Sequence, residues 1–387
     1  MQVYRDVQRL TPSHYQEVLA SFVSCVSRLP GVRAVFCFGG RSHPGISDLD
    51  TLVVVAEQAD AWALQEIAGA TRAGPLARYL FAHPPVVVPE GEVPRVRWVH
   101  TLYGLEQLWG DPLEVPWPPL EVRPWLVLAE YVDFTFSVRS VLRSLEGESV
   151  GLRSLLLLLT SCTHSLGLAA DLLGQPVHVE VEETVRRLRD HACEGTADLR
   201  EVKEATGVVV RRLREVDRAL VEFLVRTGVV TSEPVRECVP WADGRYYVFE
   251  HPAWDADLTT RAFSPDRWWW RQAGVDPRVG VYPAFYLAQF SAYALSDGPL
   301  GRAHRLLFGT WFARLITSPA YAEVLGKRMA VAERIYGVIR RGGLRPMVPL
   351  GIGFRRPEVI RPSRRRRWLR GLILRELSRG GARCSPW

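Results

Sequence analysis

Two apolar runs joined by a loop of glycines and aspartates constrain the fold of this chain more than any other feature. The first run, Val32–Phe38, ends at Gly39-Gly40, and the second, Thr51–Val55, directly follows Asp48-Leu49-Asp50. Short runs of this composition, bounded by turn residues, are typical of buried strands. Side chains alternate along a strand, so we expect Asp48 and Asp50 on the same face, with Leu49 on the other.

Two adjacent carboxylates at the start of a strand repel each other, and a bound divalent cation would relieve that repulsion. Carboxylate oxygens are hard ligands that suit magnesium, so the pair predicts a Mg²⁺ site. The glycine pair would let a phosphate group approach the backbone closely, and we expect a helix to begin there. The alternative is a strand-turn-strand whose acids are solvated at the edge of the loop.

Gly39, Gly40, Asp48 and Asp50, with Ser47 before the acids, resemble the signature of the DNA polymerase β-like nucleotidyltransferase superfamily. The resemblance covers only the N-terminal third of the chain. It implies that Asp48 and Asp50 are catalytic and hold one or two Mg²⁺ ions, which activate a hydroxyl and stabilise the departing pyrophosphate. It also implies that the two glycines contact the triphosphate of a nucleotide. We expect Ser47 to belong to the same nucleotide-binding site, with Arg41 neutralising charge there.

The rest of the first domain predicts an α+β fold with a small mixed sheet. Helical spacing of apolar residues predicts a helix over residues 11–29 and another at Ala59–Ala70. A third strand is expected at Val96–Tyr103. The resulting order, helix-strand-strand-helix-strand, fits the superfamily.

The sequence departs from the superfamily at the third acid, which members usually carry on a later strand. The strand expected at Val96–Tyr103 contains no carboxylate. The candidates to replace it lie before that strand or in the following helix: Glu90, Glu92, Glu130 and Asp133. His100 could itself serve as the base, because an imidazole titrates near neutral pH. Each candidate could equally be a surface charge or a structural histidine.

Changes in composition divide the chain into four segments. Residues 1–116 form the nucleotidyltransferase-like domain, and a proline cluster from Pro112 to Pro124 follows as a stiff linker. Residues 117–230 predict a helical bundle, with helices at Trp125–Leu145, Leu152–Leu173, Glu180–His191 and Asp198–Arg226. Residues 231–354 form a mainly helical, aromatic-rich domain, and residues 355–387 are a basic tail.

Two further patterns carry alternative interpretations. Arg186 and His191 have an Arg-x4-His spacing similar to the ribonuclease motif of HEPN domains, although an exposed charged helix face explains it as well. The tryptophans at 268–270 and the aromatic residues up to Tyr293 could stack on bases. Burial in the core is the other explanation for those aromatic residues.

The net charge of +7 comes from the C-terminal tail. Residues 355–387 contain eleven arginines and two glutamates, which leaves the first 354 residues with a net charge of −2. The tail from Arg361 to Arg383 could bind nucleic acid, an anionic membrane surface or an acidic protein partner, or it could be a solvated end. No signal peptide or transmembrane segment is visible, so we expect a cytoplasmic protein.

These observations favour a magnesium-dependent nucleotidyltransferase. It would move a nucleoside monophosphate from a nucleoside triphosphate to an acceptor hydroxyl, on a small molecule or protein rather than on a long nucleic acid. One alternative is a catalytically silent scaffold or regulator of the same fold. Another is a nucleic-acid-binding protein that uses the basic tail.

Overall fold

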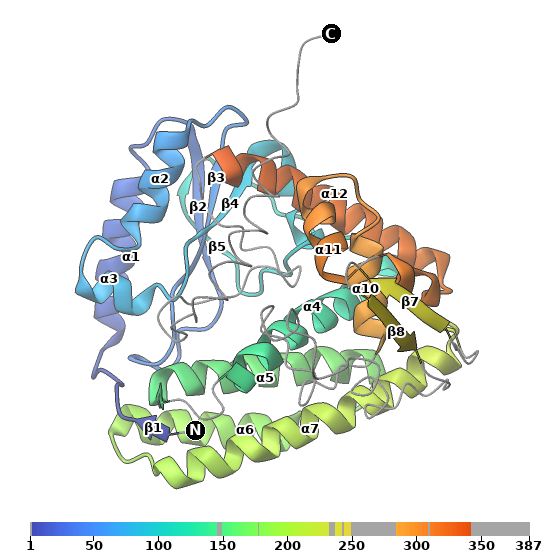
Figure 1. The fold of residues 1–387 in the computed structure, drawn as a ribbon. Coiled ribbons are helices and arrows are strands. Elements are labelled where there is room, and N and C mark those ends of the chain that lie inside the picture. Colours follow the sequence, from blue (N-terminus) through green and yellow to red (C-terminus); the bar gives the residue numbers. More distant parts are fainter. Residues whose placement is uncertain are drawn as a thin grey trace.

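The fold was obtained as a computed structural model, which describes residues 2–144, 149–176, 178–231, 237–241, 244–248, 284–308 and 310–341. It is an α+β protein, in which a small sheet near the N-terminus is followed by many helices (Figure 1). The predicted fold class is therefore confirmed. The tryptophans at 268–270 and the tail from residue 355 lie outside the described residues.

A four-stranded mixed sheet carries the loop that the sequence singled out. Its strands are β2 (Val32–Phe38), β3 (Asp50–Val55), β4 (Val86–Pro89) and β5 (Glu106–Gly110), in the order β4-β3-β2-β5. Strand β3 runs antiparallel to β2 and parallel to β4. The apolar residues of β3 and β4 are buried without alternation, as expected where both faces of a sheet are covered.

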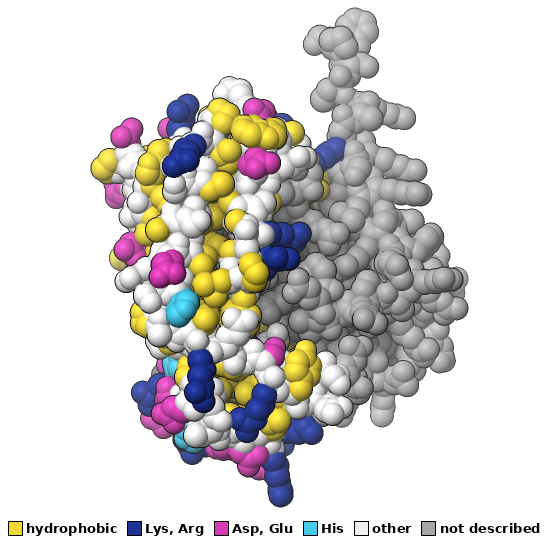
Figure 2. Space-filling model, turned by 90° about the vertical axis from the view of Figure 1, so that its left-hand side faces the viewer, with side chains coloured by type: hydrophobic (Ala, Val, Ile, Leu, Met, Phe, Trp, Pro, Cys, Tyr) yellow, Lys and Arg dark blue, Asp and Glu magenta, His cyan; other side chains and the backbone are white. Residues whose placement is uncertain are grey.

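Helices from both ends of the described chain flank this sheet. On one side lie α1 (Pro12–Val26), α2 (Ala61–Ala70) and α3 (Pro75–Leu80), and on the other lies α12 (Pro319–Arg341) (Figure 1). Helix α12 contacts β4 and α2. The face that carries α1–α3 mixes acidic, basic and apolar side chains (Figure 2).

Four long helices form a bundle next to the sheet. They are α4 (Arg123–Ser144), α5 (Leu152–Leu173), α6 (Val179–Glu194) and α7 (Leu199–Arg226). Helix α5 packs against the other three, which explains its apolar composition. It is also the one helix in the described ranges that is long and apolar enough to cross a membrane, a test that core helices of soluble proteins pass as well; 56% of the tested window is buried.

The remaining described elements connect these two parts. Strand β1 (Gln2–Tyr4) pairs in parallel with β6 (Ser149–Gly151), which precedes α5. The later elements are β7 (Glu237–Trp241), β8 (Gly244–Val248), α10 (Ala284–Tyr293), α11 (Pro299–Phe308) and the 3₁₀ helix η3 (Trp311–Leu315). Both α10 and α12 contact α4, so segments predicted as separate domains pack against one another. The boundaries between them stay predictions.

The aromatic residues of α10 form part of the core. Phe285, Tyr286, Phe290 and Tyr293 are all at least 97% buried. These four side chains therefore offer no surface on which bases could stack.

The prediction of a strand at Val96–Tyr103 is wrong. The first three residues of this segment belong to a 3₁₀ helix, η1 (Glu90–Trp98), and the other five form a loop. In that loop Leu102 has a φ of +52°, which is incompatible with a strand. Along the chain, strand β4 precedes this segment and strand β5 follows it.

The prediction of a helix that begins after the glycine pair is also wrong. Only a single turn forms, in which the carbonyl of His43 accepts hydrogen bonds from the backbone N–H groups of Ile46 and Ser47. Pro44 and Gly45, two helix-breaking residues, occupy this turn. The following strand begins at Asp50, so Asp48 lies in the loop that precedes it.

Candidate functional site: an Asp-Asp-His cluster

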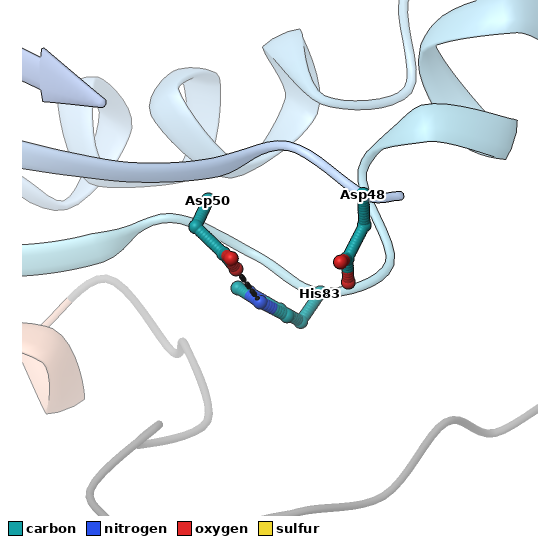
Figure 3. A group of neighbouring side chains, drawn as sticks. All are labelled: Asp48, Asp50 and His83. Atoms are coloured by element: carbon teal, nitrogen blue, oxygen red, sulfur yellow. Dashed lines mark ion pairs between the residues drawn. The ribbon is translucent and has the colours of Figure 1, made fainter. Parts of the chain in front are cut away.

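Asp48, Asp50 and His83 form a cluster at the end of the sheet where β3 begins. Each offers one ligand atom, and these three atoms lie within 4.8 Å of one another (Figure 3). Carboxylate oxygens and an imidazole nitrogen at this spacing could hold a metal ion. The sequence predicted the two aspartates, and the structure brings them together as expected.

His83 reaches the cluster because β3 and β4 are parallel. Leu52 pairs with Val86, so the residues just before β4 lie beside Asp50. The Nε2 atom of His83 forms an ion pair with Asp50 Oδ1, and its Nδ1 atom lies 3.0 Å from the carbonyl oxygen of Pro84. Burial lowers the pKa of His83, but the negative charges of Asp50 and Asp48 outweigh it and raise that pKa to about 9.

Gly39 makes room for the carboxylate of Asp50. It ends β2 with a φ of +76°, and a Cβ atom there would lie 2.8 Å from Asp50 Oδ2. Its backbone N–H donates to the carbonyl oxygen of Tyr103, 3.0 Å away. Gly40, by contrast, borders open space, because a Cβ atom would meet nothing within 4 Å. Of the two predicted phosphate contacts, Gly40 is therefore the better placed.

Helix α6 packs on the loop between β2 and β3. Ser47 is buried, and its Oγ atom accepts a hydrogen bond from Arg189 Nη2 at 2.8 Å. His43 Nε2 lies 3.1 Å from Asp190 Oδ1. Burial lowers the pKa of Arg189, whereas the charge of nearby Asp48 raises it. The helix therefore places one guanidinium group next to the aspartates.

Arg41 forms an ion pair with Glu106 at 2.9 Å and is substantially exposed. Its predicted contact with a triphosphate stays a prediction and would compete with this pair. Arg186, in the Arg-x4-His spacing, is exposed on α6. Arg189, within the same motif, faces the loop instead.

The candidates for the third acid differ sharply in their surroundings. Glu90 is half exposed and pairs with Arg33, whereas Glu92 accepts from both Arg95 and Arg334 through one oxygen. Asp133 is fully buried and pairs with Arg328 at 3.0 Å. Each of the three carboxylates thus has an arginine partner, although the second oxygen of Glu92 is buried without a hydrogen-bond partner among the described residues.

Glu130 is the remaining acid, and it lies near His100. Its Oε1 atom accepts from Thr101 Oγ1 at 2.8 Å and lies 3.5 Å from His164 Nε2, while its buried Oε2 atom has no hydrogen-bond partner among the described residues. Burial lowers the pKa of His100, and the charges of Glu130 and Asp50 oppose that shift. His100 is therefore within electrostatic reach of both carboxylates.

Three comparisons with known proteins were made for this chain. No protein-family model, curated protein or solved structure matches it. The resemblance to the polymerase β-like superfamily thus rests on the motif residues themselves.

Sequence reasoning missed His83 and Arg189. His83 stands before Pro84-Pro85 and the strand-like run Val86–Val88, and recognising that run as a neighbour of β3 would have placed it at the site. Arg189 gave no comparable signal, because its position depends on how α6 packs against the loop.

Proposed function

We propose that this protein is a metal-dependent nucleotidyltransferase. It would transfer a nucleoside monophosphate from a nucleoside triphosphate to an acceptor hydroxyl. The observation that carries the proposal is the convergence of Asp48, Asp50 and His83 beside a glycine that keeps the backbone clear of Asp50. A divalent ion held there would polarise the transferred phosphate group and favour departure of pyrophosphate.

The residues of the chain would divide the remaining tasks. Asp48 and Asp50 would hold the ion, and the open backbone at Gly40 would leave room for phosphate oxygens. The guanidinium of Arg189 adds positive charge next to Asp48. Glu130, with an unpartnered buried oxygen, and His100 are the groups best placed to accept the proton of the acceptor hydroxyl.

The near-neutral charge of residues 1–354 favours a small molecule or a protein side chain as acceptor over a long nucleic acid. The chemistry of the two aspartates alone would favour Mg²⁺. The imidazole of His83 adds a nitrogen donor, so the identity of the ion is a separate question.

A transfer assay tests the proposal. Each α-labelled nucleoside triphosphate is incubated with the protein, Mg²⁺ or Mn²⁺ and a panel of hydroxyl-bearing acceptors, with pyrophosphate release as a second readout. We expect transfer by the wild type, loss of transfer in Asp48→Asn and Asp50→Asn, and full activity in Asp111→Asn, which changes an exposed carboxylate outside the cluster. Equal transfer by the wild type and Asp48→Asn would contradict the proposal.

The second candidate is a catalytically silent scaffold, and one observation favours it. The positive charge of His83 already compensates Asp50 within the protein. If that imidazole permanently replaces the ion, the wild type binds no divalent cation and transfers no nucleotide.

A further inference from the structure

The donor set of the cluster differs from the all-oxygen set that the sequence predicted. Two carboxylates and one imidazole nitrogen converge there. We infer that this site selects a first-row transition ion of the Mn²⁺ class over Mg²⁺, with His83 Nε2 as the ligand that decides the preference. The inference needs only the metal site, and it names the cofactor of the proposed reaction.

The orientation of His83 matches that of a metal-binding histidine. Its Nδ1 atom lies 3.0 Å from the carbonyl oxygen of Pro84, which can only accept a hydrogen bond, so Nδ1 carries a proton. That contact turns Nε2 towards the two aspartates (Figure 3). Histidines that bind metals almost always donate their second ring N–H in this way, which fixes both the tautomer and the ring orientation.

The backbone around His83 holds the imidazole in place. A residue that precedes proline is confined to extended conformations, and Pro84-Pro85 follow His83 directly. The parallel pairing of β4 with β3 then fixes this segment beside Asp50. The side chains of His83 and Asp50 are 18% and 23% exposed, so an ion could enter from solvent. Without metal, Nε2 carries the proton of its ion pair with Asp50, so a bound ion would displace that proton while the stiff segment keeps the nitrogen in position.

The chemistry of the donors favours a transition ion. Mg²⁺ prefers oxygen ligands and keeps several of its waters, whereas imidazole suits the later divalent ions. Mn²⁺ accepts carboxylate oxygens readily and is the first ion in the affinity order of divalent first-row metals at N/O sites. Sites of mixed nitrogen and oxygen ligands generally bind transition ions more tightly than Mg²⁺. A preference of the wild type for Mn²⁺ is therefore less informative than the change in that preference when His83 is replaced.

The test combines spectroscopy with competition. Electron spin-echo spectroscopy of bound Mn²⁺ reports whether a ¹⁴N nucleus is coordinated, and titration of Mg²⁺ against bound Mn²⁺ gives the ratio of affinities. The variants are His83→Asp, which restores an all-carboxylate set, and the control His14→Asp. His14 lies in the first turn of α1, where an aspartate is favourable.

We expect ¹⁴N coupling in the wild type and in His14→Asp, and its loss in His83→Asp. The Mn²⁺/Mg²⁺ preference should fall at least tenfold in His83→Asp alone. Mn²⁺ bound to the wild type without ¹⁴N coupling would overturn the inference. So would a wild type that binds neither ion; binding of Mg²⁺ by His83→Asp would then identify His83 as a permanent counter-ion. Because the behaviour of the wild type decides by itself, a variant that fails to fold does not block the test.

This outcome is distinguishable from failure of the proposed function. Coupling to ¹⁴N with no transfer in the presence of any ion would leave the metal inference standing and reject the nucleotidyltransferase. Nucleotide transfer with Mg²⁺ at the same rate in the wild type and in His83→Asp would support the nucleotidyltransferase and reject the metal inference.

Discussion

The Asp133–Arg328 pair and the Asp-Asp-His cluster are two groups of charged side chains in the described part of the chain, and their difference indicates which one acts on a ligand. Asp133 and Arg328 are 0% and 1% exposed, and the carboxylate also accepts from Gln289 and Tyr293. In the Asp-Asp-His cluster the side chains of His83 and Asp50 are 18% and 23% exposed to solvent. A fully buried pair held by several hydrogen bonds has a structural role, whereas partly open acids beside an imidazole have room for an ion.

The surroundings of the two clusters lead to the same conclusion. Arg328 also donates to the carbonyl oxygen of Trp98 at 2.6 Å and so ties α12 to η1. The Asp-Asp-His cluster instead lies between β3, a tight turn and a proline-flanked loop. Removing a partner should therefore affect folding in the first cluster and ligand binding in the second.

The largest expected effect is the loss of Arg328. Arg328→Met leaves the carboxylate of Asp133 buried without its cation, and breaking such a pair costs about 3–5 kcal/mol of unfolding free energy. Urea denaturation measures this loss. Lys327→Ala, on the same helix, removes an ion pair that is half exposed and should cost less than about 1 kcal/mol. Similar losses in the two variants would remove the contrast between the clusters.

The second effect separates binding from folding in the Asp-Asp-His cluster. A ligand at 100 times its dissociation constant stabilises the folded state by about 2.7 kcal/mol. We expect that gain for the wild type with Mn²⁺, and none for Asp48→Asn, whose stability without metal should stay close to that of the wild type. Thermal unfolding with and without the ion measures both quantities. A large loss of stability in metal-free Asp48→Asn would instead assign Asp48 a structural role.

The third effect compares the two glycines of the motif. Gly39→Ala forces a side chain into the left-handed region and against Asp50, which should cost about 1–2 kcal/mol. It should also weaken binding of the ion, because the carboxylate must move. Gly40→Ala meets open space and should change stability by less than about 0.5 kcal/mol. If both variants behave alike in denaturation and in metal titration, Gly39 does not position Asp50.

The sequence predicted the two strands on either side of the aspartate loop better than it predicted the imidazole of His83, the third ligand group of the site. Val32–Phe38 and the helix Leu152–Leu173 were predicted to the residue, because long apolar runs with clear ends depend on local pattern. The segment Val96–Tyr103 was misread as a strand, since it is the end of a 3₁₀ helix followed by a loop in which Leu102 has a positive φ. His83 was missed because the pairing of Val86–Val88 with β3 was not recognised, and Arg189 could not be predicted, because only the packing of α6 brings it to the loop.

The smallest expected effect concerns the contact between α6 and the loop. Ser47→Ala removes the hydrogen bond from Arg189, and a bond of this kind contributes about 1 kcal/mol. Ser42→Ala, at an exposed position of the same loop, is the matched control and should have a smaller effect. If Arg189 also binds phosphate, freeing its guanidinium from Ser47 changes the affinity for a nucleoside triphosphate more than it changes stability. Calorimetric titration with a triphosphate, set beside urea denaturation, distinguishes these two roles. Loss of stability with unchanged triphosphate affinity would show that α6 only supports the loop, and would leave phosphate recognition to the backbone at Gly40.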